Sequence, residues 1–385
     1  MDVVRIIARL NVGGPAKHVA WLSSGLQKKS WTHKLLHGVI DGDEDDLSTF
    51  SKNLSVDCVQ IDSLEKNISF KDIKAFIDIF LLLLKHSPKV LHTHTSKAGF
   101  LGRAAGLVLN VLRPWSKMKI VHTFHGHTFH GYFSLSKERL FLNIEKFLAK
   151  FASHAIVTIS KQQQQEIRDQ FKVGHPSKHH LISLGIDTDF ANRLDKTALK
   201  QRLNIPDDSK VFGIVGRIAP IKNHRLFIES VAEFHKINDQ NISFVIVGGC
   251  SDQDMALLKD YSQSLGVNSI IFAGNVKTPE EIYGALDYLV LTSKNEGTPV
   301  SILEAFASKI PVASTSVGGV IDIVGSNNDR GLLCDQNAKE LASLYHHLLT
   351  EDNSTRVDKA HQFVHENYSI DNLVNKMDDL YKSLT

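Results

Sequence analysis

The sequence predicts an α/β protein built from two doubly wound domains, each with a parallel sheet covered by helices on both faces. Short apolar runs typical of buried strands alternate with helical patterns along the whole chain. The alternation restarts after about residue 190. The length of 385 residues also fits two domains, at a prior of about 150 residues per domain.

In the first half, the predicted strands span residues 3–10, 34–39, 56–60, 90–94, 120–124 and 155–160. The first is a continuous apolar run, which is typical of a strand buried in a parallel sheet. It ends in a turn at residues 11–15 that holds Gly13 and Gly14, and a helical pattern follows at 16–27. A later helix is predicted from apolar residues that share one face: Leu140, Phe141, Ile144, Phe147, Leu148 and Phe151.

In the second half, the predicted strands span residues 211–215, 243–247, 269–272, 288–292 and 311–314. Residues 191–204 have the pattern of a helical connector, and residues 205–208 that of a turn. The tail at 371–384 is a helical pattern with no strand after it. We therefore expect domains at 1–190 and 191–365, with a C-terminal helix within 366–385 that packs back on the first domain.

Composition excludes several classes of protein. With 42% apolar and 22% charged residues, the chain is a globular protein and not a disordered one. The apolar stretch at 79–84 is far shorter than the roughly 20 residues of a membrane span. The start lacks a basic segment typical of a signal peptide, and three widely separated cysteines do not form a disulfide framework. We expect a cytoplasmic protein.

Charge is divided unevenly along the chain. Residues 1–190 hold 25 Lys and Arg against 17 Asp and Glu, whereas residues 191–385 hold 19 against 25. Between Asp78 and Glu138 there is no carboxylate, but there are eight Lys or Arg and seven His. This stretch is either compositional drift or a surface that faces an anionic partner, such as a membrane, a phosphorylated acceptor or a nucleic acid.

Three loops at predicted strand ends could bind a ligand, since ligands of open parallel sheets bind there. The first holds Gly13 and Gly14, which follow the first strand and precede a helix. Glycines let a backbone approach a phosphate, and a helix N-terminus favours an anion. The pair lacks the G-x-G-x-x-G spacing of a dinucleotide site, so a plain tight turn is an equally good interpretation.

The second loop, residues 216–223, follows the strand 211–215. It carries Arg217 and Lys222, and Asn223 is a candidate N-cap of the next helix. A guanidinium and an ammonium on one loop suit a diphosphate, because the first binds oxygens in a fork and the second acts as a point charge. The alternative is two ordinary surface cations.

The third loop follows the strand 288–292. Gly297, Thr298 and Pro299 open a predicted helix, whose first N–H groups have no intrahelical acceptor. Glu296 precedes this helix and Glu304 lies about one and a half turns inside it, so both carboxylates could accept hydrogen bonds from the hydroxyls of one elongated ligand. Alternatively, both are ordinary acids favoured by the helix dipole.

Four motifs together resemble a known family. They are the Gly-Arg-x4-Lys loop at 216–222, the Glu-x7-Glu segment at 296–304, Val317-Gly318-Gly319 and Arg330-Gly331-Leu332-Leu333. This combination resembles the retaining glycosyltransferases of family 4, over 211–335 and more loosely over 1–20 and 89–190. The resemblance implies the GT-B architecture, in which two Rossmann-like domains face each other across a cleft. Asp322 departs from the family pattern, which has glutamate there.

The resemblance implies a role for each matching residue. Arg217 and Lys222 would hold the diphosphate of a nucleotide-sugar donor, Glu304 its ribose hydroxyls and Glu296 its sugar hydroxyls. His125, in the Thr-Phe-His segment 123–125, would contact the transferred sugar. The remaining implied donor-binding residues are Gly13, Gly14, Asn275, Val276, Gly297, Thr298, Pro299 and Val300.

Histidines in the first domain raise the question of a metal site. His92 and His94 lie two apart on a strand and therefore share a face, and His127 and His130 follow His125. No Cys or acidic ligand lies near them in the sequence, and the resemblance is to metal-independent enzymes. We therefore expect no metal and no cofactor, with these other histidines packing, capping or lining an acceptor site.

The expected activity is transfer of a sugar, with retention, from a nucleotide-diphosphate sugar to a hydroxyl of a lipid-linked glycan in cell-surface polysaccharide biosynthesis. A UDP-sugar is the favoured donor, and peripheral contact with the anionic inner face of the cell membrane is expected. The alternative is a GT-B epimerase or hydrolase of nucleotide sugars without a glycan acceptor. Nucleic-acid binding is disfavoured because the basic stretch has no such motif and few aromatic residues.

Overall fold

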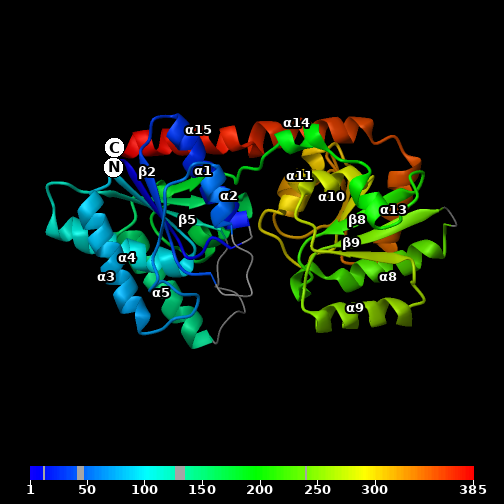
Figure 1. Ribbon diagram of the computed structural model, residues 1–385, viewed down its shortest axis with the longest axis horizontal. Helices are drawn as coiled ribbons and strands as arrows, with labels where there is room; N and C mark the ends of the chain where they lie inside the picture. The colour runs from blue at the N-terminus through cyan, green and yellow to red at the C-terminus, as the bar shows by residue number, and fades with distance from the viewer. Residues whose placement is uncertain (12–13, 41–46, 126–134, 239–240) are drawn as a thin grey trace. The chain divides into compact units, whose positions relative to one another are not determined.

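The computed structural model describes residues 1–11, 14–40, 47–125, 135–238 and 241–385, which form two compact units (Figure 1). Unit 1 comprises Met1–Gly185 together with Ile370–Thr385, and unit 2 comprises Ile186–Ser369. The junctions lie a few residues from the domain limits that the sequence predicts. The N–H of Ile186 donates to the carbonyl of Tyr368 at 2.8 Å, so the two junction segments of unit 2 lie side by side.

Unit 1 contains a parallel sheet of seven strands in the order β3-β2-β1-β4-β5-β6-β7. The strands are β1 (Val3–Ile7), β2 (His33–His37), β3 (Cys58–Gln60), β4 (Val90–His94), β5 (Lys119–Phe124), β6 (Ala155–Thr158) and β7 (His179–Leu181). Alternation along each strand sends successive side chains to opposite faces. Val4 therefore packs with α3, α4 and α5, whereas Val3 packs with α1 and α15.

Helices cover both faces of this sheet. They are α1 (Gly14–Lys28), α2 (Ser48–Asn53), α3 (Lys71–His86), α4 (Ser96–Leu112), α5 (Leu135–Phe151), α6 (Lys161–Gln165) and α15 (Ile370–Leu384). The layer of α3, α4 and α5 buries residues at helical spacing, such as Ala75, Ile79 and Leu83. This layer lies on one side of the strands in Figure 1, and α1 with α15 lies on the other.

The C-terminal helix α15 belongs to unit 1 by its packing. Its Leu373, Met377 and Tyr381 are buried in a core cluster with Leu22 and Leu26 of α1. The helices approach closely because α1 has a glycine at the crossing: a Cβ on Gly25 would lie 2.3 Å from Cγ2 of Val374. The last segment of the chain thus completes the core of the first unit.

Unit 2 contains a parallel sheet of six strands in the order β10-β9-β8-β11-β12-β13. The strands are β8 (Lys210–Val215), β9 (Ile242–Val247), β10 (Ile270–Gly274), β11 (Tyr288–Leu291), β12 (Val312–Thr315) and β13 (Leu332–Cys334). The helices are α7 (Ala198–Arg202), α8 (His224–His235), α9 (Asp252–Ser264), α10 (Pro279–Ala285), α11 (Val300–Ala307), α12 (Val320–Val324), α13 (Ala338–Thr350) and α14 (Ser354–Tyr368). Figure 1 shows α10 and α11 on the opposite side of β8 and β9 from α8 and α9.

All eleven predicted strands are present, which confirms the predicted fold class. The structure differs from the prediction in two places. The expected connector helix at 191–204 is broken into a 3₁₀ helix, Asp189–Arg193, and α7, because the Asp195 carboxylate accepts from the N–H groups of Thr197 and Ala198 and starts a new helix. Strands β7 and β13 were not predicted; each has three residues and lies at a sheet edge, as does β3, which was predicted.

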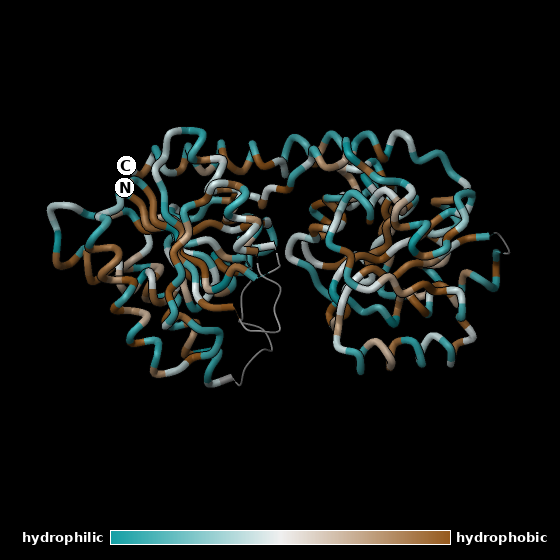
Figure 2. The backbone as a smooth tube through the Cα atoms, viewed as in Figure 1, coloured by the Kyte–Doolittle hydropathy of each residue, from teal (hydrophilic) through white to brown (hydrophobic). Residues whose placement is uncertain are grey.

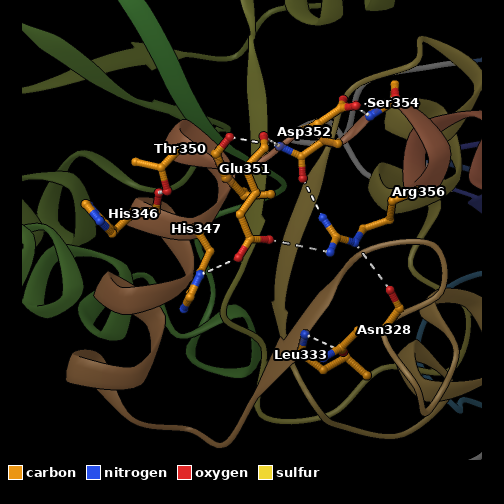
Figure 3. Close-up of polar contacts among 11 residues, drawn as sticks. Asn328, Leu333, His346, His347, Thr350, Glu351, Asp352, Ser354 and Arg356 are labelled. Atoms are coloured by element: carbon orange, nitrogen blue, oxygen red, sulfur yellow. Dashed lines mark hydrogen bonds and ion pairs between the residues drawn. The ribbon is translucent and has the colours of Figure 1, made fainter.

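A polar cluster joins the end of α13 to α14 and to the turn before β13 (Figure 3). Arg356 donates to the carbonyl of Asn328 at 3.3 Å and lies 3.8 Å from the carboxylate of Glu351, which also contacts His347 at 2.8 Å. The side chain of Asn328 accepts from the N–H of Leu333 at 3.0 Å. The cluster fixes the turn 325–331 and so the start of β13.

Candidate active site

The predicted cationic and acidic loops of unit 2 leave neighbouring strands of its sheet. From β8 the chain proceeds outward to β9 and β10, and it then returns to pair β11 with β8 before continuing to β12 and β13. This reversal of strand order is a topological switch point, where loops diverge and leave room for a ligand. The loop 216–223 follows β8, and the loop 292–299 follows β11.

An ion pair joins the two loops. Nζ of Lys222 lies 2.5 Å from Oε1 of Glu296, and the hydroxyl of Ser293 donates to the same oxygen at 2.6 Å. The hydroxyl of Thr292 donates to the main-chain carbonyls of Lys222 and Asn223 at 3.0 and 3.1 Å. The Glu296 side chain is 11% exposed and that of Lys222 is 26% exposed, so the pair is held at the surface of the switch point.

Arg217 differs from Lys222 in having a free guanidinium. Its side chain is exposed, and within the described ranges no side chain or carbonyl forms a hydrogen bond or ion pair with it. The residue before it, Gly216, has φ +153°, a conformation that side-chain-bearing residues rarely adopt. Asn223 occupies the N-cap position of α8, as predicted, but in the left-handed conformation and without a side-chain capping bond.

Two further loops meet the first one at the same sheet edge. The N–H of Gly248, after β9, donates to the carbonyl of Gly274 at 2.9 Å. A Cβ built on Gly248 would lie 2.0 Å from the carbonyl oxygen of Gly216, so only a glycine fits here. Asn275 and Val276 follow directly after Gly274, and the Cβ of Asn275 lies 3.5 Å from a Cβ built on Gly249. The loops after β8, β9 and β10 therefore form one surface.

Helix α11 begins at Val300 with Pro299 at its N-cap position, so Gly297 and Thr298 precede the helix. Gly297 faces open space, since a Cβ there would have no neighbour within 4 Å among the described atoms. The hydroxyl oxygen of Thr298 is buried and has no hydrogen-bond partner in the described part of the chain. The N-terminus of α11 thus presents backbone and hydroxyl groups that can still accept a partner.

The two glutamates of the Glu-x7-Glu segment are fixed by different partners. Oε2 of Glu304 accepts a hydrogen bond from the hydroxyl of Tyr283 on α10 at 2.7 Å. Tyr283 is buried, and burial next to this carboxylate raises the pKa of its phenol well above the usual value, so it remains a donor. The backbone of Glu296 is held by the N–H of Gly319, which donates to its carbonyl at 2.8 Å.

In unit 1 the switch point lies between β1 and β4, and three histidines gather there. His18 belongs to the first turns of α1 after β1, His94 ends β4, and His125 follows β5. Nδ1 of His94 lies 2.9 Å from Nε2 of His125, and the His18 ring lies 4.8 Å from that of His125. Gly14 begins α1 at the same edge, whereas Gly13, His127 and His130 lie outside the described residues.

These imidazoles are neutral near pH 7. Burial lowers the pKa of His125 to about 4 and lowers those of His18 and His94 well below their usual value. No carboxylate contacts them among the described side chains, so nothing restores the charged form. A neutral imidazole both donates and accepts hydrogen bonds, which suits a sugar hydroxyl.

A buried polar network packs against the histidine cluster. Arg5 donates to the hydroxyl of Tyr381 at 3.5 Å, and that hydroxyl lies 2.6 Å from Nδ1 of His92. Because arginine only donates, the tyrosine proton goes to Nδ1, and Nε2 of His92 then donates to Thr123 at 2.7 Å. The rings of His92 and His94 lie 4.1 Å apart. Helix α15 is thereby linked to the histidine cluster.

The same three histidines have the spacing of a metal site. Their candidate ligand nitrogens all lie within 4.8 Å of one another, and neutral imidazole is a common ligand. His122 points to the other sheet face, where Nδ1 contacts the hydroxyl of Thr93 at 2.9 Å. The expectation of no metal stays a prediction from the sequence.

Sequence reasoning missed three residues that the structure brings into these sites. Ser293 and Tyr283 each bind one of the predicted glutamates, and His18 completes the histidine cluster. A signal existed for His18, which lies one helical turn after the glycine pair, on the loop side of the first helix. No local pattern distinguishes Tyr283 from an ordinary core tyrosine.

The chain matches two family models and a named relative. A family model described as Glycosyltransferase Family 4 matches residues 12–190, and one described as Glycosyl transferases group 1 matches residues 195–369. Over 294 residues, the chain is 32% identical to a UDP-Gal:alpha-D-GlcNAc-diphosphoundecaprenol alpha-1,3-galactosyltransferase of Escherichia coli, covering 74% of this chain and 72% of that protein.

Solved structures share the fold over the whole chain. The Anabaena protein Alr3699/HepE, in complex with UDP and glucose, superposes with a TM-score of 0.81 at 17% identity and covers 100% of both chains. A glycosyltransferase from Rickettsia africae superposes with a TM-score of 0.80 at 19% identity, covering 100% of this chain and 98% of that one. The fold and the sequence matches define a glycosyltransferase of the GT-B fold. The chain belongs to glycosyltransferase family 4.

Proposed function

We propose that this glycosyltransferase moves a sugar from a UDP-sugar, with retention of anomeric configuration, to a hydroxyl of a lipid-linked glycan in cell-surface polysaccharide biosynthesis. The observation that carries the donor half is the switch point of unit 2, where adjoining loops hold the exposed guanidinium of Arg217, the Lys222–Glu296 pair and the N-terminus of α11.

A diphosphate fits this arrangement electrostatically. Arg217 would bind two phosphate oxygens in a fork, and Lys222, held beside Glu296, would supply a second positive charge. The first N–H groups of α11 would add hydrogen bonds and the positive end of the helix dipole. Glu304, oriented by Tyr283, would accept from the ribose hydroxyls. Glu296 and His125 would contact hydroxyls of the transferred sugar.

The chemistry needs charge stabilisation at the leaving group. The bond between the anomeric carbon and the diphosphate oxygen breaks, and the acceptor oxygen forms a new bond to that carbon on the same face. The acceptor proton goes to the departing phosphate, so the proposal needs no protein base. Arg217 and Lys222 stabilise the negative charge that grows on the diphosphate, which is the largest demand of such a step. We propose that no metal takes part.

The donor and acceptor classes have support from relatives. The Escherichia coli relative is named for UDP-Gal and for a diphosphoundecaprenol-linked GlcNAc acceptor, and the Anabaena structure holds UDP and glucose. A lipid-linked acceptor is held at a membrane surface, so the enzyme would work there. Among the described residues no helix has the length and apolar character to span a bilayer. Location in the cytoplasm at the inner membrane face stays a prediction from the sequence.

The experiment that tests this function combines ligand screening with product analysis. Thermal-shift screening against UDP-, GDP- and ADP-sugars should give the largest stabilisation with a UDP-sugar, because a bound ligand raises the melting temperature. Incubation of that donor with an undecaprenyl-diphosphate-linked sugar in detergent should give a new α-linkage from an α-linked donor, measured by NMR. Release or isomerisation of the sugar without transfer would instead support the epimerase or hydrolase alternative.

The metal proposal has its own readout in the same assay. Activity should be unchanged after treatment with EDTA, and zinc should not raise it. Loss of activity in EDTA that zinc restores, together with loss of the zinc effect in a His18→Ala variant, would assign a metal to the histidine cluster instead.

A further inference from the structure

Exposed apolar side chains concentrate on one layer of unit 1. Among the described residues, 19 large apolar side chains are exposed, and 13 of them lie between residues 68 and 151. Scattered exposed apolar residues are normal on a soluble protein, whereas a contiguous apolar patch marks an interaction surface. The elements concerned are the helices α3, α4 and α5 and the loops beside them.

Helix α3 has apolar residues on two opposite sides. Ala75, Ile79 and Leu83 are buried against the sheet. Ile73, Ile77 and Leu81 repeat the same four-residue spacing two positions earlier, which is about 200° around the helix, and they are 65%, 47% and 53% exposed. A helix that packs only on a sheet has one apolar face, so packing on the sheet does not explain the second stripe.

The other two helices of the layer repeat the feature. On α4 and the loop after it, Phe100, Val108, Val111, Leu112 and Trp115 are exposed, with Trp115 at 80%. On α5, Leu140, Phe147 and Phe151 are 53–57% exposed. Helix α3 packs on α4, and the buried Arg103–Glu145 pair ties α4 to α5, so the stripes belong to one layer. Figure 2 shows apolar segments on these helices.

Charge on this layer is one-sided. Lys74 and Lys85 accompany the exposed apolar residues of α3, and Arg139 and Lys150 accompany those of α5; all four are exposed. None of the four carboxylates on the three helices is exposed, and three have cationic or hydroxyl partners: Asp72 with Lys97, Asp78 with Ser63 and Glu145 with Arg103. Among the described residues, the three helices therefore present exposed apolar side chains and exposed cations but no exposed carboxylate.

We propose that this outer face, made of the exposed residues of α3, α4, α5 and the loop 113–117, is the surface by which the protein binds an anionic lipid bilayer. Apolar side chains flanked by lysine and arginine are the composition of interfacial membrane helices, in which apolar groups enter the acyl boundary and the cations contact anionic headgroups. A protein partner or a second copy would pair such cations with carboxylates. The proposal deepens the proposed function, since a lipid-linked acceptor resides in such a membrane.

The test measures binding to vesicles without donor or acceptor, so its outcome is independent of the transfer reaction. The protein should co-sediment with vesicles of phosphatidylglycerol and phosphatidylcholine, and not with phosphatidylcholine alone. An apolar variant, Ile77→Ser with Leu81→Ser and Val111→Ser, and a charge variant, Lys74→Glu with Lys85→Glu, should each lower the partition coefficient roughly tenfold or more.

Matched controls lie on unit 2. Ile237→Ser with Leu257→Ser and Leu265→Ser removes three apolar side chains that are 60%, 53% and 41% exposed, and Lys196→Glu with Lys339→Glu makes the same charge change. Both controls should bind anionic vesicles like the unmodified protein, and all variants should keep its melting temperature. Equal binding by every variant, or no binding by the unmodified protein at low salt, would overturn the proposal. If the unmodified protein forms concentration-dependent dimers and the apolar variant does not, this face would instead be a dimer interface.

Discussion

At the scale of single residues, the donor site depends on pairs of side chains rather than on isolated ones. Glu304 is an example: the buried hydroxyl of Tyr283 binds one of its oxygens and so orients the other. If this carboxylate accepts from the ribose, the enzyme should distinguish UDP from 2′-deoxy-UDP, because the deoxy ligand leaves the carboxylate without one hydrogen bond.

The first prediction follows from that pair. Glu304→Gln should remove most of the preference for UDP over 2′-deoxy-UDP, and Tyr283→Phe should weaken UDP binding by about tenfold, the effect of roughly one hydrogen bond to a charged group. Isothermal titration of both nucleotides measures this. An unchanged preference in Glu304→Gln would mean that this residue does not contact the ribose.

The second prediction concerns the protonation state of His125. Its pKa of about 4 means that the ring stays neutral throughout pH 5.5–8.5, so kcat/KM should show no acid limb near pH 6.5 that belongs to this residue. His125→Gln, which keeps a hydrogen-bonding group, should lower kcat at every pH without changing the shape of the profile. An acid limb near pH 6.5 that disappears in His125→Gln would show instead that this imidazole titrates during the reaction.

At the scale of helices and strands, the reversal of strand order brings the loops of the candidate site to one sheet edge. Glycines then allow these loops to approach each other closely. A Cβ on Gly319 would lie 1.8 Å from the carbonyl oxygen of Gly297, so the Val317-Gly318-Gly319 turn can lie against the acidic loop only without a side chain. The hydrogen bond from Gly319 to Glu296 depends on the same approach.

The third prediction compares the two glycines of this contact. Gly319→Ala should push the loops apart and lower both stability, by roughly 1–3 kcal/mol, and UDP affinity. Gly297→Ala should leave the melting temperature unchanged, since its Cβ points into open space, and should weaken only donor binding. Thermal melts with and without UDP separate the two effects. A Gly319→Ala protein with normal stability would contradict the packing argument.

The sequence predicts most of the strands and site loops correctly, and the errors have physical causes. Long apolar strands such as β8 and the loops after them are readable because period and glycine content are local features. The break at Asp195 was missed although its signal is local, since the carboxylate accepts from residues two and three positions later. The edge strands β7 and β13 were missed because the pairing of three residues depends on partners elsewhere in the chain. For the same reason the hydrogen bond of Tyr283 to Glu304 could not be foreseen.

At the scale of the whole molecule, the two units differ in their sensitivity to acid. Burial lowers the pKa of His33 and His125 to about 4, and it lowers those of His18, His92, His94 and His122 well below their usual value; all six belong to unit 1. In unit 2, burial also lowers the pKa of His224 to about 4, so the larger number of such histidines lies in unit 1. Between pH 6.5 and 4 the unfolded chain binds protons that the folded chain does not. Stability is therefore full above pH 6.5 and falls as the pH drops toward 4.

The fourth prediction is that unit 1 unfolds before unit 2 on acidification. Each of these buried histidines should lower the free energy of unfolding by about 2 kcal/mol at pH 5, relative to neutral pH. All three tryptophans, Trp21, Trp31 and Trp115, lie in unit 1, so their fluorescence reports its unfolding alone. Between pH 7.5 and 5, the melting temperature measured by tryptophan fluorescence should fall more steeply than that of the other calorimetric transition, which reports the unfolding of unit 2. Parallel shifts of both would contradict this division.

We propose that Arg217 and Lys222, at the switch point of unit 2, hold the donor diphosphate. The most direct measurement is UDP affinity and turnover for Arg217→Ala and Lys222→Ala, with Arg225→Ala as the control, because Arg225 lies on the next helix and packs on the ring of Tyr261. We expect both site variants to stay folded but to lose about 100- to 1000-fold in kcat/KM, or ~3–4 kcal/mol of transition-state stabilisation, while Arg225→Ala is nearly normal. Near-normal turnover in Arg217→Ala, whose side chain is exposed and unpaired among the described residues, would contradict it.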